Sequence, residues 1–286
     1  MKETWAQFVH SPECLYDCRR LRFRDEMKVR FLDSFSIEDG PIRILEIGCG
    51  SGAFSQRLAQ WYPMAEVIGL DVDVDYISYA RRRVTGVSFY CHDLREMDSF
   101  VAVHGTFDYV FTHSMFGFVN TSELMDAIVM ALHKGGCAIT VSNRLSMGLR
   151  SRLWDPPCPE FKLMNKEDEQ LELLCDKRDY TAEGVILELK RYGMSIEKVD
   201  YIAVPLQPFG NARQDVREMY RKFQRNRLEM LGRRKGYTND AIKVLCEMND
   251  KLFVSLLNKT EETCAGILNV DVLEIIKSKL PCAGQS

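Results

Sequence analysis

The residues with the clearest chemical potential are three glycines and the acid that follows them. Gly48, Gly50 and Gly52 come directly after the apolar run Ile44–Ile47, and Asp71 ends a second apolar run about twenty residues later. Glycine has no Cβ, so a ligand can lie directly against the backbone of such a turn. The Asp71 carboxylate can accept hydrogen bonds from the two hydroxyls of a ribose. The pattern therefore predicts a nucleotide site.

The glycine turn alone does not select the nucleotide. Gly48-x-Gly50-x-x-Ala53 with Asp71 also fits the fingerprint of an NAD-binding turn. Three features favour S-adenosylmethionine (SAM) instead. Glu46, two residues before the first glycine, can face an ammonium group, and the third glycine falls at position 52. Asp93, after a third apolar run, can accept from the exocyclic amine of adenine.

Alternating strands and helices would position these residues. Apolar runs and breakers predict strands at 42–47, 66–71, 87–91, 107–112 and 137–142, and helices at 53–61, 73–84, 96–103 and 121–133. This alternation implies parallel strands joined by right-handed crossovers, with both faces covered. Ligands of such sheets bind at the carboxyl ends of the strands. The candidate residues, and His113 after the fourth strand, all fall at those ends.

At this point five motifs, in order, resemble the class I SAM-dependent methyltransferases. They are L-E-I-G-C-G-S-G at 45–52, G-L-D-V-D at 69–73, C-H-D-L at 91–94, F-D-Y-V-F-T-H at 107–113 and L-H-K-G-G at 132–136. The resemblance covers residues 40–142 well and the flanks loosely. It implies an α/β fold with a doubly wound, mostly parallel seven-stranded sheet, N-terminal helices and a helical cap or insertion. It also implies methyl transfer from SAM, which leaves S-adenosylhomocysteine (SAH).

The resemblance implies cofactor contacts from nine residues: Glu46, Gly48, Cys49, Gly50, Gly52, Asp71, Val72, Asp93 and Leu94. The turn would line the methionine and ribose, with Cys49 contributing backbone contact. Asp71 would accept from the ribose hydroxyls and Val72 would pack beside adenine. The Asp93 carboxylate would accept a hydrogen bond from the adenine amine, and the Leu94 backbone amide would donate one to a ring nitrogen of adenine. The alternative for both aspartates is helix capping or solvation.

His113 is the candidate catalytic residue, because an imidazole can act as a general base near neutral pH. The alternatives are a hydrogen-bonded wall residue or a contact to the cofactor. Tyr16, Arg19 and Arg22 of the leader are further candidates for contacts to cofactor or substrate. The segment T-H-S-M-F at 112–116 differs from the N-P-P-Y signature of enzymes that methylate planar amide or nucleobase nitrogens, which disfavours those substrates.

The chain is expected to divide into four parts. Residues 1–40 form a helical leader or lid that starts a helix at Ser11-Pro12, and residues 41–205 form the SAM-binding core, with a cap loop at 143–180. Residues 206–262 form a helical insertion, and residues 263–286 hold a final antiparallel strand at 270–277 and a tail. The core also contains a helix at 181–192 and a strand at 196–204.

Composition narrows the class of protein. The chain has 286 residues, 46% hydrophobic and 28% charged, with a net charge of -3, which argues against a general nucleic-acid binder. It has no long apolar span, and its start lacks the apolar core of a signal peptide, so a cytoplasmic protein without membrane contact is expected. The ten cysteines form no C-x-x-C pair, so they are interpreted as reduced packing residues, and no metal site is predicted.

The favoured function is methyl transfer to a small-molecule acceptor by in-line displacement. One alternative is an RNA-modifying methyltransferase that uses the basic stretch 213–235. Another is an NAD-dependent oxidoreductase, and a third is a SAM-binding module without turnover. The sequence does not identify the acceptor, the methylated atom (O, N, S or C) or the oligomeric state.

Overall fold

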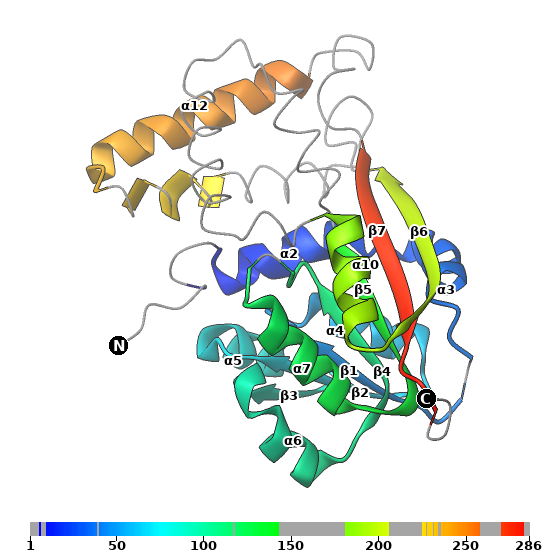
Figure 1. Cartoon of the computed structure of the whole chain (residues 1–286). Coiled ribbons are helices and arrows are strands. Elements are labelled where there is room, and N and C mark those ends of the chain that lie inside the picture. Colours follow the sequence, from blue (N-terminus) through cyan, green and yellow to red (C-terminus); the bar gives the residue numbers. More distant parts are fainter. Residues whose placement is uncertain are drawn as a thin grey trace.

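One seven-stranded sheet with helices on both faces organises the chain (Figure 1). The computed structural model describes residues 6, 10–38, 40–116, 118–142, 181–205, 225, 226, 228–230, 232, 233, 236–257 and 270–282. The strands are β1 Arg43–Ile47, β2 Glu66–Asp71, β3 Ser88–Cys91, β4 Phe107–His113, β5 Leu132–Ser142, β6 Ser195–Pro205 and β7 Val270–Lys279. The α-helices are α2 Pro12–Arg22, α3 Lys28–Phe35, α4 Ala53–Trp61, α5 Val74–Arg83, α6 Met97–His104, α7 Thr121–Ala131, α10 Ala182–Arg191 and α12 Asn239–Leu257. Two short 3₁₀ helices are η1 Asp25–Met27 and η2 Leu94–Glu96.

The sheet has the strand order β3-β2-β1-β4-β5-β7-β6. The first five strands are parallel to their neighbours, whereas β7 runs antiparallel to both β5 and β6. The predicted doubly wound, mostly parallel sheet and the antiparallel final strand are confirmed. The NAD-binding sheet has six strands in the order 3-2-1-4-5-6, so an antiparallel strand between β5 and β6 separates this fold from it.

Most predicted elements match the observed ones within one or two residues, and the clearest difference lies around β5. The strand expected from residue 137 begins at Leu132, and the preceding helix ends at Ala131. Leu132 pairs with Phe107, and regular pairing resumes only at Cys137 opposite Tyr109. The interruption contains Gly135 with φ of +86°, a conformation that glycine adopts without strain. Because this stretch lacks apolar alternation, sequence patterning starts the strand too late.

Two apolar cores fill the space between sheet and helices. On one face α6, α7 and α10 pack on the sheet, and the core includes Leu45, Phe100 and Ile128. On the other face α3 and α4 pack on it through a cluster of aromatic rings: Phe23, Phe31, Phe35, Phe54, Trp61 and Phe111. Residues alternate between the faces along each strand, so Leu45 and Ile47 face the first core, whereas Ile44 faces the second and Glu46 shares its direction.

Helix α2 lies over the edge of the sheet that holds the glycine turn. It begins as predicted at Ser11-Pro12, where the Ser11 hydroxyl accepts from the Cys14 amide. Figure 1 shows α2 across the upper edge of the sheet, above α4 and α5. Ser51 in the turn donates to the Pro12 carbonyl at 2.7 Å. The described part of the leader thus contains the helices α2 and α3, and the Ser51–Pro12 hydrogen bond links it to the glycine turn.

The segment between β6 and β7 contains helix α12, at the position predicted for a helical insertion. Leu228, Ile242 and Cys246 form a small separate core there. The predicted cap loop at 143–180 and much of the basic stretch 213–235 lie outside the described residues. The division of the chain into four parts stays a prediction. Within the described residues, no helix combines the length and apolar character needed to cross a bilayer.

Candidate active site at the glycine turn

The turn between β1 and α4 has three glycines in the left-handed region. Gly48, Gly50 and Gly52 have φ values of +75°, +53° and +79°. A Cβ on Gly52 would lie 2.6 Å from the Phe89 ring, so this glycine allows α4 to pack on the sheet. On Gly48 it would lie 2.1 Å from the Met115 sulfur. These contacts require glycine, as the sequence predicts, but at Gly52 the reason is packing.

The side chains above the turn come from two elements that cover it. Met115 follows β4 and approaches Gly48, and Leu15 of α2 would lie 2.7 Å from a Cβ on Gly50. These two apolar side chains occupy the space over Gly48 and Gly50 that a Cβ would need. Sequence reasoning missed Leu15 and Met115, because both reach the turn only through tertiary packing.

The amides of the turn are bonded within the protein. Gly48 and Cys49 both donate to the Leu70 carbonyl, at 2.8 and 2.9 Å, and Gly52 donates to the Cys49 carbonyl at 3.0 Å. Gly50 donates to Asp71 Oδ2 at 2.8 Å. A turn that holds a pyrophosphate presents its amides to the ligand. These four amides are engaged within the protein, which disfavours the NAD interpretation.

Asp71, at the end of β2, links the glycine turn to the next strand. Its Oδ2 accepts from Gly50, and its Oδ1 accepts from the Asp73 amide at 2.9 Å. Burial raises the pKa of this carboxyl to about 6, although the backbone hydrogen bonds oppose the shift. Each oxygen keeps a second lone pair, so ribose hydroxyls remain possible donors. Val72, the next residue, is 58% exposed, so its apolar side chain is accessible, and its contact with adenine stays a prediction.

Glu46, at the carboxyl end of β1, is a buried acid. Its side chain is 1% exposed, and Ser55 in the first turn of α4 donates a short hydrogen bond to Oε2. Burial raises the pKa of Glu46 to about 8, and the Ser55 hydrogen bond and the nearby Arg19 only partly offset it. The group is therefore mostly protonated near pH 7. The role of Ser55 was not predicted, although its place in the first turn of α4 faces the end of β1.

His113 lies beside Arg19 of the leader. It is 3% exposed, and its Nε2 lies 2.9 Å from Arg19 Nη1. Arginine only donates, so Nε2 is the acceptor and Nδ1 carries the proton. Burial lowers the pKa of His113 well below its ordinary value, and the charges of Arg19 and Arg22 act in the same direction. The ring meets Phe23 edge-on, with centroids 4.9 Å apart.

The surroundings of His113 affect its predicted role as a general base. The Nε2 lone pair already accepts from Arg19, and the imidazole is neutral and weakly basic. The arrangement corresponds to the hydrogen-bonded wall residue that was the alternative interpretation, and the base role stays a prediction. The other two leader candidates have partners within the protein: Tyr16 donates to Gln56 at 2.5 Å, and Arg22 donates to the Cys18 sulfur at 2.8 Å.

Asp93 lies away from this cluster and acts as a cap. It accepts from the Arg95 amide at the start of η2 and forms an ion pair with the Arg95 guanidinium at 2.5 Å. The hydrogen bonds to Arg95 lower the pKa of Asp93 to about 2. Capping was the alternative interpretation of this residue, and the structure shows it. The adenine contact stays a prediction.

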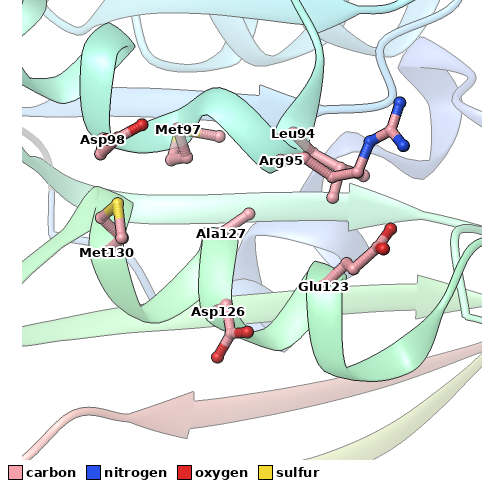
Figure 2. A pocket seen from close by; sticks show the side chains of 8 residues that line it. All are labelled: Leu94, Arg95, Met97, Asp98, Glu123, Asp126, Ala127 and Met130. Atoms are coloured by element: carbon pink, nitrogen blue, oxygen red, sulfur yellow. The ribbon is translucent and has the colours of Figure 1, made fainter.

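A pocket of about 310 Å³ opens beside Asp93, between η2–α6 and α7. Figure 2 shows Leu94, Arg95 and Met97 on one side and the α7 residues on the other. The complete lining is Leu94, Arg95, Met97, Asp98, Glu123, Asp126, Ala127 and Met130. The Leu94 side chain thus faces this pocket, which does not include the glycine turn. Three acids in its wall make it unsuited to an anionic ligand.

The strand order, the antiparallel β7 and the glycine turn followed by Asp71 define a class I SAM-dependent methyltransferase fold. Residues 44–136 match a family model described as a methyltransferase domain. Together the fold and the family model identify residues 44–136 as a class I SAM-dependent methyltransferase domain.

Relatives and solved structures agree with this identification. The chain is 31% identical over 91 residues to malonyl-acyl-carrier-protein O-methyltransferase of Bacillus anthracis, covering 31% of this chain and 32% of that protein. It is 35% identical over 99 residues to trans-aconitate 2-methyltransferase of Rhodopseudomonas palustris (strain BisB18), covering 34% and 37%. The chain thus spans about a third of the length of these curated relatives.

Two solved structures share the fold across almost the whole chain. Phosphoethanolamine N-methyltransferase 2 of Haemonchus contortus, in complex with phosphomonomethylethanolamine and SAH, aligns over 97% of this chain and 59% of its own, with a TM-score of 0.53 and 16% identity. A SAM-dependent methyltransferase of Anabaena variabilis aligns over 95% and 96%, with a TM-score of 0.52 and 13% identity. At these identities the likeness concerns the fold.

Proposed function

We propose that this protein binds SAM at the glycine turn and transfers its methyl group to a small-molecule acceptor by in-line displacement. The observation that carries the proposal is the turn itself, whose Gly50 amide is bonded to Asp71 and whose three left-handed glycines follow the buried Glu46. SAM supplies a methyl group already activated on a sulfonium. The protein therefore needs chiefly to bind, orient and exclude water.

The residues at the carboxyl edge divide this work. The Asp71 carboxylate accepts hydrogen bonds from the ribose hydroxyls, and the Val72 side chain packs against the adenine ring. Glu46 balances the ammonium of the amino-acid end and ionises as that cation binds. Helix α2 covers the turn through Leu15 and the Ser51–Pro12 hydrogen bond, and so keeps water from the reacting methyl group.

The first acceptors to test are trans-aconitate and malonyl-acyl carrier protein, since the named relatives modify them. The alternative RNA substrate has less support. Arg225, one of the described residues in the basic stretch, forms an ion pair with Asp250 at 2.7 Å and another with Glu229 at 3.5 Å. A guanidinium engaged in this way contributes less to a phosphate site.

Thermal unfolding with SAH and NADH tests the cofactor. A ligand at about 100 times its Kd stabilises by about 2.7 kcal/mol, which raises Tm by about 5–10 °C for a domain of this size. SAH should produce this shift and NADH should not, and stabilisation by NADH alone would reverse the assignment. Asp71→Asn should reduce the SAH shift, whereas Asp98→Asn, in the pocket beside α7, should not. Transfer of labelled methyl groups from SAM to the two acceptors then tests turnover.

A further inference from the structure

Arg19 is a partly buried cation with one hydrogen-bond partner among the described residues. That partner is His113 Nε2, 2.9 Å from Nη1. Within the described part of the chain, no carboxylate lies within the 4.0 Å that defines an ion pair with this guanidinium. A guanidinium has five N–H donors in a planar fork, so most of its donor capacity is unused. Such an arrangement is costly unless an anion completes it.

The charged and titratable groups around Arg19 do not supply that anion. They come from α2, β1 and α5: Arg22, Cys18, Glu46 and Tyr76. Arg22 repels Arg19, and burial raises the pKa of the Tyr76 phenol, which stays neutral. Glu46 is the one carboxyl among these groups, but it is mostly protonated near pH 7. Burial lowers the pKa of Arg19 to about 10, so the guanidinium stays charged at neutral pH.

The position of Arg19 shows which ligand anion is in reach. Leu15, one helical turn earlier on α2, lies over Gly50. Arg19 therefore lies on the same face of α2, where it contacts His113 at the end of β4 and interacts electrostatically with Glu46 at the end of β1. The Glu46 carboxyl on β1 and the Arg19 guanidinium on α2 can thus bind the two charged groups of a zwitterion. The ligand's ammonium fits Glu46, and its carboxylate fits the open side of Arg19.

We propose that Arg19, held in place by His113, binds the carboxylate of the cofactor's amino-acid end. This inference rests on the proposed function. His113 is then a positioning residue: its neutral ring accepts one Arg19 N–H, and the edge-on contact with Phe23 fixes the ring. This role explains why the His113 imidazole is weakly basic. It also explains why no carboxylate among the described residues pairs with the Arg19 guanidinium.

Ligand pairs that differ only in the amino-acid end test the proposal. SAH carries this end, and 5′-methylthioadenosine lacks it. Calorimetric titration of both into Arg19→Met should show SAH binding about 10- to 100-fold weaker, as for a lost charge-assisted bond, with 5′-methylthioadenosine changed by less than about twofold. The matched control is Arg20→Met, the neighbouring residue on the same helix, whose guanidinium lies over the Tyr16 ring. It should leave both affinities unchanged.

Each other result overturns the inference. Equal weakening of both ligands would mean that Arg19 only holds α2 in place, and unchanged SAH binding would mean that its anion is not the cofactor's. If the wild-type protein binds neither ligand, the proposed function itself fails.

The positioning role of His113 is tested by replacing this residue. Gln offers an amide oxygen to Arg19, so His113→Gln should keep the preference for SAH over 5′-methylthioadenosine. In His113→Leu the preference for SAH over 5′-methylthioadenosine should fall about tenfold. Equal preferences in the two variants would exclude a positioning role for His113.

Discussion

The buried carboxyl of Glu46 leads to a stability prediction with a definite sign. The folded-state pKa is about 8, whereas an unfolded glutamate titrates near 4.3. At pH values between these two pKa values, the unfolded state has released the proton and the folded state keeps it. The free energy of unfolding therefore falls as pH rises. The contribution is fully present below the unfolded pKa and is lost as pH rises through about 8. Linkage over pH 6 to 8 gives a loss of about 2 kcal/mol from this group.

The substitution Glu46→Gln should remove this pH-dependent loss of stability. The Gln oxygen can accept from Ser55 as Oε2 does, and its amide hydrogens replace the carboxylic proton. The free energy of unfolding of the variant, relative to wild type, should therefore increase by about 2 kcal/mol between pH 6 and pH 8. Asp71 titrates mainly below this window, since its pKa is about 6.

Urea unfolding at pH 6, 7 and 8 measures the effect, with Glu96→Gln as the control at an exposed position. The control should track the wild type at every pH. Parallel profiles of wild type and Glu46→Gln across the window would refute the reasoning, because Glu46 would then be ionised in the folded protein. The same variant should bind SAH about tenfold more weakly, since a neutral amide cannot balance an ammonium. A more stable protein with weaker binding is the expected combination.

Three further substitutions test the turn and its surroundings. Asp71→Asn should destabilise by about 1–3 kcal/mol in urea unfolding, because an amide group would face a backbone N–H that the carboxylate now accepts. Gly52→Ala should cost more than Gly86→Ala in the same assay: both have φ near +78°, but only Gly52 brings a Cβ within 2.6 Å of the Phe89 ring, so equal losses would contradict the packing argument. Val72→Ser should weaken SAH by about 3- to 10-fold in calorimetry without changing the urea midpoint, because its apolar surface is exposed in the free protein.

Residue patterning predicts the core of this fold well for a physical reason. A central strand of the parallel sheet such as β1 is buried on both faces, so the run Ile44–Ile47 is largely apolar and is bounded by breakers. The glycines and Asp71 could also be predicted, because their places at strand ends follow from topology. Patterning fails at Leu132, where a glycine-containing irregularity continues the strand without alternating residues.

The polar contacts of the site were beyond prediction because they join distant segments. The contact between Arg19 and His113 spans 94 positions and depends on how α2 docks. Asp93 shows a different limit: its local pattern is equally compatible with a cap and with a ligand contact. The structure shows the cap, and the ligand contact stays a prediction. Protonation is likewise invisible in sequence, since Glu46 acquires its raised pKa only from burial.

The place of β7 between β5 and β6 has a consequence for biosynthesis. Among the described strands, β6 lies at the edge of the sheet and pairs with β7 alone, and β5 pairs with β7 on its outer side. Until Val270–Lys279 leave the ribosome, both strands therefore have open edges that can pair with other chains. The five parallel strands can associate while translation continues, but the sheet closes only when this late segment inserts between two earlier ones. Such non-local pairing is slow, so the nascent protein has a period of exposure to aggregation before it is complete.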